Sequence, residues 1–239
     1  MTPALQQVAR DFLVESCRAK YSYGFSWLGR KTIQYPQDLM AFQEIIVSTR
    51  PGVIVELGVA HGGTTLFLAS VTNTLGLMSP ADIPMASQTL ILGVEKHFLP
   101  ETEDIFKSSR LGTSIHVIEG SSVSVSTVQA VWDIAAPSGK RRGVLVILDS
   151  DHEASHVLAE LRAYADLCRP GDYMVVCDTI VDEVPDGSFP WNPVRRGVGP
   201  GQAVKEFLAE NFDFEADRSI DERLLISANP GGYLRRKSP

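Results

Sequence analysis

The stretch Val53-Ile54-Val55-Glu56-Leu57-Gly58-Val59-Ala60-His61-Gly62-Gly63-Thr64 decides the fold. Residues 53–57 form a short apolar, β-branched run with one acid, which is typical of a buried strand. Glycines follow this run, and residues 64–71 then have the pattern of a helix. The stretch therefore predicts a strand that passes through a glycine-rich turn into a helix, the repeating unit of parallel α/β sheets.

The rest of the chain repeats this alternation of strand and helix. Four more apolar runs predict strands, at residues 90–94, 115–118, 144–148 and 173–176. Helical spacing of apolar residues predicts helices at 123–134, 154–168 and 202–212. We therefore predict an α/β protein with a Rossmann-like, mostly parallel sheet and helices on both faces. Residues 223–227 and 232–234 could close the sheet as an antiparallel pair.

An N-terminal segment, residues 1–50, precedes the predicted core at 51–239. Apolar spacing predicts a helix over residues 4–20, and a second helix opens at Pro36 and ends before Pro51. Between them lies an aromatic, glycine-containing stretch. It either packs over the core as a loop or faces the substrate, and its candidate substrate residues are Tyr23, Phe25, Trp27 and Tyr35. Two long turn-rich stretches, 72–89 and 182–201, are typical of lids or mobile segments.

Composition narrows the classes of partner. The 239 residues carry a net charge of −7 without clustered Lys or Arg, so we expect a small-molecule partner and no nucleic acid. No apolar run is long enough to cross a bilayer, and the N-terminus lacks a signal-peptide pattern, so no membrane association is expected. The three cysteines, Cys17, Cys168 and Cys177, lack metal-type spacing. We therefore expect a soluble, cytoplasmic protein.

The glycine-rich turn and the end of the second strand can both hold a ligand. Glycines allow close approach of the backbone, and a helix N-terminus offers free N–H groups. Gly58, Gly62 and Gly63 do not form the dinucleotide pattern G-x-G-x-x-G, and an acid before the first glycine suits a ligand with an ammonium group. Glu95 could bind both hydroxyls of a ribose. Alternatively, the turn is a structural corner and Glu95 is an exposed carboxylate.

Acidic residues gather where the fourth and fifth strands end. Asp149 and Asp151 share a side of an extended chain, and Asp178 follows the next strand. Carboxylates in one cleft repel each other unless a cation is present, which favours Mg²⁺. Alternatively, these aspartates cap helices and contact solvent. His152 and His156, four residues apart, could be metal ligands or could cap the following helix.

Several short motifs carry a family resemblance. They are Trp27-Leu28-Gly29, Gln34-Tyr35-Pro36, Asp38-Leu39, residues 148–152, Glu119-Gly120-Ser121-Ser122 and Arg169-Pro170-Gly171-Asp172. Together they resemble class I S-adenosylmethionine (SAM)-dependent methyltransferases, and more narrowly the cephalosporin hydroxylase and rhamnosyl O-methyltransferase family, over roughly residues 20–235. The resemblance implies a seven-stranded sheet, bound SAM, Mg²⁺, and O-methylation of a hydroxyl on a secondary metabolite or sugar, as in antibiotic biosynthesis.

The resemblance also assigns roles by position. The implied SAM contacts are Glu56, Gly58, His61, Gly62, Gly63, Thr64, Glu95, Gly120, Ser121, Ser122 and Asp149. The implied metal ligands are Asp151 and Asp178, with Asp149 as a rival or additional ligand. Cys177 stands where the family tends to place a glutamate. Metal-dependent catechol-type methyltransferases offer a parallel in which the metal aspartate matches Asp149 and the catalytic lysine matches His152, which makes these two the catalytic candidates.

Three other interpretations stay open. A nicotinamide-dependent reductase would share the strand-turn-helix start but needs the missing glycine pattern. A non-haem iron oxygenase could use Asp151, His152 and His156, although such sets usually lie on β-barrels. A non-catalytic partner protein could bind the cofactor alone. The N-terminal helix and the aromatic stretch could also build the interface of a homo-oligomer.

Overall fold

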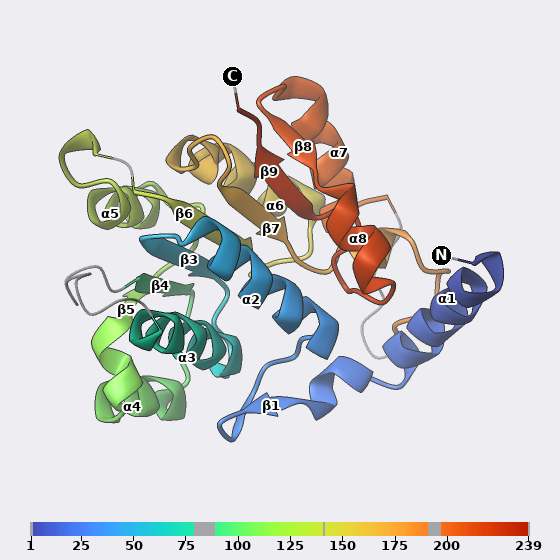
Figure 1. Cartoon of the computed structure of the whole chain (residues 1–239), viewed down its shortest axis with the longest axis horizontal. Helices are drawn as coiled ribbons and strands as arrows, with labels where there is room; N and C mark the ends of the chain where they lie inside the picture. The colour runs from blue at the N-terminus through green and yellow to red at the C-terminus, as the bar shows by residue number, and fades with distance from the viewer. Residues whose placement is uncertain (1, 79–88, 141, 191–196, 239) are drawn as a thin grey trace.

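A seven-stranded sheet in the order β5-β4-β3-β6-β7-β9-β8 forms the centre of the computed structural model (Figure 1). The strands are β3 (Val53–Leu57), β4 (Leu90–Glu95), β5 (Ile115–Glu119), β6 (Val144–Leu148), β7 (Tyr173–Val176), β8 (Phe214–Ala216) and β9 (Tyr233–Arg236). The first five are parallel, whereas β9 is antiparallel to both β7 and β8. The strands that follow β3 in sequence, β4 and β5, lie on one side of it, whereas β6 and β7 lie on the other side. The carboxyl end of β3 is therefore a topological switch point, where such sheets bind ligands.

The structure describes residues 2–78, 89–140, 142–190 and 197–238. Its helices are α1 (Pro3–Arg18), α2 (Pro36–Thr49), α3 (Gly63–Leu77), α4 (Pro100–Ser108), α5 (Val125–Ala135), α6 (Ala154–Tyr164), α7 (Pro200–Glu210) and α8 (Arg218–Leu224). Short 3₁₀ helices and a small hairpin of β1 (Ser26–Trp27) and β2 (Arg30–Lys31) complete it. None of the described helices combines the length and apolarity that a membrane crossing requires.

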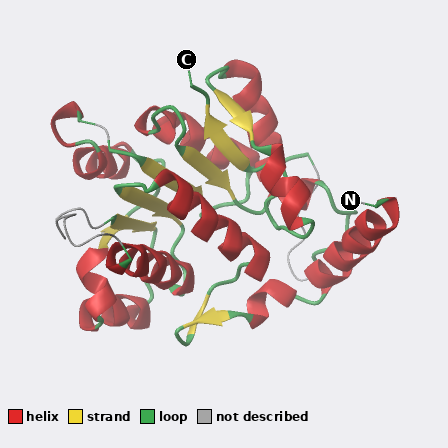
Figure 2. Ribbon diagram, viewed as in Figure 1, coloured by secondary structure: helices red, strands yellow, loops and turns green. Residues whose placement is uncertain are grey.

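Helices cover both faces of the sheet, as Figure 2 shows. Side chains alternate along a strand, so Val53, Val55 and Leu57 pack with α5, α6 and α7 on one face. Ile54 packs with α2 and α3 on the other face. The predicted Rossmann-like α/β fold with a mostly parallel sheet is therefore confirmed, and its five parallel strands lie within one residue of their predicted bounds.

The C-terminal pairing differs from the prediction. Residues 223–227 do not form a strand, because α8 begins after Asp217, whose carboxylate accepts hydrogen bonds from the Ser219 N–H and hydroxyl. The partner of β9 is instead β8, with Phe214 opposite Arg236. The sequence analysis also overlooked α4, although Pro100 at its first position and two acids in its first turn are a helix start signal.

The two long loops are shorter than predicted where the structure describes them. Helix α3 continues to Leu77, and Leu75 packs on the core, so only part of 72–89 can be a loop. At the other loop, α7 begins at Pro200. Residues 79–88 and 191–196 lie outside the described residues, so a lid at either place stays a prediction.

The N-terminal segment contacts the core in two ways. Helix α2 packs directly on the sheet. Before it, Cys17 of α1 and Tyr35 pack with Ile180, Val184 and Ala228 in a third apolar cluster. The end of α1 and the stretch up to Tyr35 therefore lie beside the carboxyl edge of the sheet, whereas the predicted domain boundary after residue 50 stays a prediction.

A buried carboxylate joins α2 to the C-terminal strand. Asp38, which is fully buried, accepts hydrogen bonds from the Ser227 hydroxyl (2.6 Å), the Ala228 N–H (2.9 Å) and the Tyr233 hydroxyl (2.7 Å). Burial raises the pKa of Asp38 to about 6, and the hydrogen bonds oppose this shift. Three groups distant in sequence thus depend on one side chain.

We expect Asp38→Ala to lower the free energy of unfolding by about 3 kcal/mol, because it leaves three buried donors without an acceptor. Urea denaturation measures this change. Asp133→Ala, which removes an exposed aspartate from α5, is the control and should change stability by less than about 0.5 kcal/mol. Equal stability of the two variants would contradict the assigned role of Asp38.

Candidate active site at the carboxyl edge of the sheet

Two adjacent cavities open where β3, β4, β5 and β6 end. The first, of about 270 Å³, is lined by the N-terminal segment, the glycine-rich turn, Asp149, His152 and Asp178. The second, of about 200 Å³, is lined by Glu95, Lys96, Gly120, Ser121, Ser122, Asp151 and His156. Gly58 and Ser150 line both cavities. An elongated ligand could therefore lie across Gly58 with one end in each cavity.

Gly58 is required at the point where the cavities meet. Its φ is +95°, and a Cβ added there would lie 2.1 Å from the carbonyl oxygen of Asp149. At the same place, the Asp149 N–H donates a hydrogen bond to the Leu57 carbonyl at 2.8 Å and holds the two strand ends together. Any side chain would force β3 and β6 apart, so the glycine follows from packing as well as from ligand access.

Gly63 allows a second close approach, at the start of α3. A Cβ there would lie 2.2 Å from the carbonyl oxygen of Lys31. One residue on, the Thr64 hydroxyl donates to the Thr32 carbonyl at 3.1 Å. Thr64 and His61 both line the first cavity. The start of α3 thus packs against the N-terminal segment, and residues of both line the first cavity.

Glu56 is a buried acid on the wall of the first cavity. It is 1% exposed, and its carboxylate accepts a hydrogen bond from the Thr65 hydroxyl at 2.6 Å. Burial raises its pKa to about 8, against the lowering effect of that hydrogen bond. A cationic ligand group in the cavity would stabilise the charged carboxylate, as the sequence analysis expected for an ammonium group.

Glu95 stabilises the glycine-rich turn. Its Oε2 accepts from the N–H groups of Val59 and Ala60, both at 3.0 Å, and its Oε1 accepts from the Lys96 N–H at 2.8 Å. It also lines the second cavity. Its predicted contact with a ribose stays a prediction, and the structure adds a role in joining the ends of β3 and β4.

Asp149, His152 and Asp178 form a cluster in the first cavity. One ligand atom from each lies within 4.8 Å of the others, and His152 Nε2 is 2.5 Å from Asp178 Oδ2. Removal from water and the nearby Asp178 raise the pKa of Asp149 to about 8. Burial alone would lower the pKa of His152, but Asp178 reverses this and raises it to about 9. The cluster therefore concentrates negative charge that a cation would relieve.

The donor set suits Mg²⁺. Two carboxylates supply the oxygen ligands that this ion prefers, and a bound cation would oppose both the desolvation and the Asp178 charge that raise the pKa of Asp149. Gln34 Nε2 donates to Asp149 Oδ2 at 2.8 Å and fixes one of these carboxylates. The residues present thus fit a divalent ion, and Asp149 and Asp178 are the groups that would hold it.

Asp151 and Cys177 lie outside this cluster. Asp151 Oδ1 accepts from the Glu153 N–H at 2.9 Å at the start of α6, which is the capping alternative considered above. Cys177 packs in the apolar cluster with α2 and α3, and burial raises the pKa of its thiol well above the usual value. His156 also points elsewhere, into the second cavity. The Asp151, His152 and His156 set of an iron oxygenase is therefore not assembled.

The four aromatic candidates for substrate contact separate into two pairs. Tyr23 and Tyr35 line the first cavity. Phe25 does not line it and instead packs on Tyr21, with ring centroids 4.9 Å apart. Trp27 lies on α3, because the β1–β2 hairpin directs it to Phe67 and its Nε1 donates to the Ser70 hydroxyl. Phe25 and Trp27 thus have packing roles, the loop alternative for this stretch.

Several site residues were not predicted. Thr32 and Gln34 are buried, and Thr32 Oγ1 and Gln34 Oε1 have no hydrogen-bond partner among the described residues. Thr32 lines the first cavity. Glu160, fully buried below the second cavity, was also missed. An acid on the otherwise apolar face of α6, between Val157 and Leu161, is the sequence pattern that could have identified Glu160 as a buried site residue.

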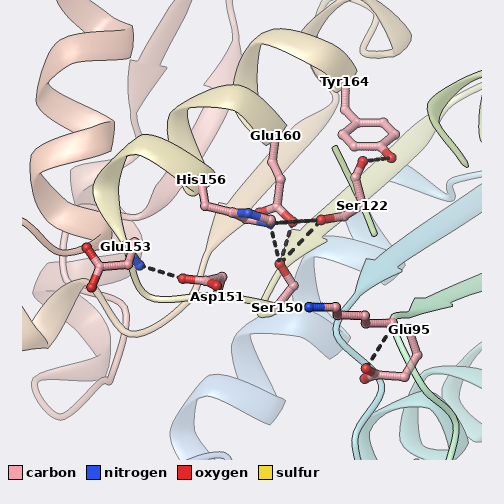
Figure 3. Close-up of polar contacts among 9 residues, drawn as sticks. Glu95, Ser122, Ser150, Asp151, Glu153, His156, Glu160 and Tyr164 are labelled. Atoms are coloured by element: carbon pink, nitrogen blue, oxygen red, sulfur yellow. Dashed lines mark hydrogen bonds and ion pairs between the residues drawn. The ribbon is translucent and has the colours of Figure 1, made fainter. Parts of the chain in front are cut away.

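The second cavity has a polar floor, which Figure 3 shows. Ser122 and Ser150 lie there beside His156, with Glu160 behind them. Gly120 holds the preceding turn at φ +154°, and a Cβ there would be 2.4 Å from Thr127 Oγ1. The predicted ligand stretch 120–122 is thus at the cavity, and the hydroxyls around it can form specific hydrogen bonds.

Comparisons with known proteins agree with this geometry. A model of the rhamnosyl O-methyltransferase/CmcI family matches residues 19–237. The rhamnosyl O-methyltransferase of Mycobacterium leprae (strain TN) is 28% identical over 214 residues, which cover 89% of this chain and 83% of the relative.

Solved structures share the fold. A CmcI structure described with Mg and SAM has a TM-score of 0.61 at 17% identity and covers 90% of this chain and 78% of its own. An O-methyltransferase from Bacillus cereus, in complex with SAH, has a TM-score of 0.53 at 13% identity and covers 90% and 82%. At these identities the likeness shows the fold alone.

The acidic cluster predicts stabilisation by Mg²⁺. Saturating Mg²⁺ should raise the Tm by about 4 °C at pH 8, and Asp149→Asn should abolish the rise. Because the pKa of Asp149 is raised to about 8, the ion must displace a proton at lower pH, so the rise should shrink toward pH 6. Asp104→Asn, an exposed change on α4, should respond as the wild type does. A wild-type Tm that does not change when Mg²⁺ is added at pH 8 would exclude this metal site.

Proposed function

Because the chain belongs to the rhamnosyl O-methyltransferase/CmcI family, we propose that it transfers a methyl group from SAM to a hydroxyl of a small molecule. The observation that carries this proposal is the pair of cavities that meet at Gly58 beside an acidic cluster. One cavity offers Glu56 to an ammonium group, and the other offers Glu95 and serine hydroxyls to a nucleoside. The family's substrates favour a sugar or secondary-metabolite hydroxyl as acceptor.

The glycine-rich turn supports the cofactor part of the proposal. SAM supplies an activated methyl group on a positively charged sulfur. Glu56 would bind its ammonium group, and the N-terminus of α3, which has no side-chain cap, would bind its carboxylate. Glu95 would accept from the ribose. These residues orient the methyl group toward the first cavity, where Asp149 and His152 lie.

The acceptor would bind in the first cavity, under the N-terminal segment. Tyr23 and Tyr35 form part of its wall, and Ser16 and Cys17 of α1 also line it. Mg²⁺ held by Asp149 and Asp178 would supply a Lewis acid that lowers the pKa of the acceptor hydroxyl. Gln34 holds Asp149 in place, so a residue of the N-terminal segment also orients one of the carboxylates that would bind the metal.

His152 would remove the proton from the acceptor hydroxyl. Its side chain is 43% exposed at the cavity, and Asp178 holds Nε2 at 2.5 Å. The same carboxylate would stabilise the imidazolium that forms. A raised pKa of about 9 makes His152 a strong proton acceptor, but only its neutral form can act.

The proposed function is tested by His152→Ala on a panel of phenolic and sugar acceptors, with formation of S-adenosylhomocysteine as the measurement. We expect kcat to fall about 100-fold or more while the affinity for S-adenosylhomocysteine stays unchanged, because His152 acts on the acceptor. His116→Ala, an exposed change on β5, should keep full activity. Full activity of His152→Ala would overturn the assigned role, and no affinity of the wild type for S-adenosylhomocysteine would overturn the function.

Glu56 should make cofactor binding depend on pH. Its pKa of about 8 means that binding of an ammonium group releases a proton below pH 8. The affinity for S-adenosylhomocysteine should rise from pH 6 to 8 and then level off. Glu56→Gln should weaken binding about tenfold or more at pH 8 and remove this rise.

Isothermal titration calorimetry in buffers of different ionisation enthalpy measures the released proton directly. Glu206→Gln, the same change at an exposed position of α7, should match the wild type. Proton release that persists in Glu56→Gln would assign the pH dependence to another group.

A further inference from the structure

A closed hydrogen-bond network lies below the second cavity (Figure 3). The hydroxyls of Ser122 and Ser150 both donate to Glu160 Oε1, each at 2.5 Å. His156 Nε2 lies 3.0 Å from Ser122 Oγ, 3.3 Å from Ser150 Oγ and 3.4 Å from Glu160 Oε1. Four side chains from the ends of β5 and β6 and from α6 thus meet around one carboxylate oxygen.

The network has only one consistent direction. Each serine has a single hydroxyl proton, and both protons point to Glu160. His156 Nε2 is therefore surrounded by three oxygens that offer it no proton, so it must carry a proton and donate. The hydrogen bond to Glu160 also raises the pKa of His156, which favours this state. Ser122 and Ser150 are consequently left with lone pairs only.

The position of the network is fixed by its surroundings. Glu160 is fully buried, and the Tyr164 hydroxyl donates to the Ser122 carbonyl at 2.6 Å, which holds the loop after β5. Ser122 is 5% exposed and Ser150 is open to solvent, yet both line the second cavity. Because Glu160 is fully buried, its carboxylate cannot turn to bulk water and is held as the acceptor for both hydroxyls before a ligand arrives.

We infer that Glu160 and His156 lock the hydroxyls of Ser122 and Ser150 as hydrogen-bond acceptors, and that these read the 6-amino group of a purine in the second cavity. This inference rests on the proposed function, which puts a nucleoside in that cavity. An amino group can donate hydrogen bonds to these serine oxygens. The 6-oxo group of a deaminated purine is itself an acceptor, so it forms no hydrogen bond with them and its lone pairs are repelled by theirs. A buried polar site of this kind rejects the mismatched ligand strongly.

The experiment compares S-adenosylhomocysteine with its 6-oxo counterpart, S-inosylhomocysteine, by calorimetry. The wild type should bind the 6-amino ligand about 100-fold more tightly. Glu160→Met removes the acceptor that directs both hydroxyls, so they can rotate and donate to the 6-oxo group. The affinity ratio should then fall about tenfold, which a general loss of structure would not produce.

Two further variants keep the test decisive. Ser150→Ala removes one exposed hydroxyl without disturbing the buried carboxylate, and should lower the ratio even if Glu160→Met does not fold. Glu210→Met, on the surface of α7, is the matched control and should keep the wild-type ratio. Equal wild-type affinity for both ligands, or an unchanged ratio in Ser150→Ala, would overturn the inference and leave the proposed function standing. A wild type that binds neither ligand would instead refute the proposed function.

Discussion

The contact between the ends of β3 and β6 is the constraint on which the site depends. The Gly58 backbone lies so close to the Asp149 carbonyl that no side chain fits between them. This contact brings the glycine-rich turn and the acidic cluster together and leaves a cavity on each side. Because two central, fully buried strands set the distance, the site is fixed by the most rigid part of the fold.

Buried acids give the site its chemistry. Glu56 and Asp149 both have pKa values raised to about 8, because removal from water disfavours their charged forms and nearby carboxylates add to this effect. Such groups destabilise the folded chain when they ionise, and they become favourable when a cationic ligand group or metal ion arrives. Glu160 differs, since its Oε1 accepts hydrogen bonds from two serine hydroxyls of the chain itself. One type of side chain thus serves binding in two places and specificity in a third.

Local sequence patterns predicted the strands of the core, but they did not predict contacts between residues that are distant in sequence. The five parallel strands are β-branched apolar runs, and the glycine-rich turn is a continuous signal. The pairing of β8 with β9 depends on residues about 20 apart, and the helix between them had no strong apolar pattern. Gln34 meets Asp149 across 115 residues, and Glu160 meets Ser122 across 38. The direction of Trp27 likewise follows from a hairpin that only the folded chain defines.

Much of the wall of the first cavity comes from the stretch before β3, together with Ile180, Val181 and Phe189 after β7, whereas Glu95 and the serines line the second cavity. The acceptor side and the cofactor side proposed above therefore draw mostly on different parts of the chain. If Tyr23 contacts the acceptor as proposed, substitutions there would change which acceptor is admitted and leave the second cavity unaltered. Substitutions at Gln34 would have a wider effect, because its side-chain amide also holds Asp149 in place.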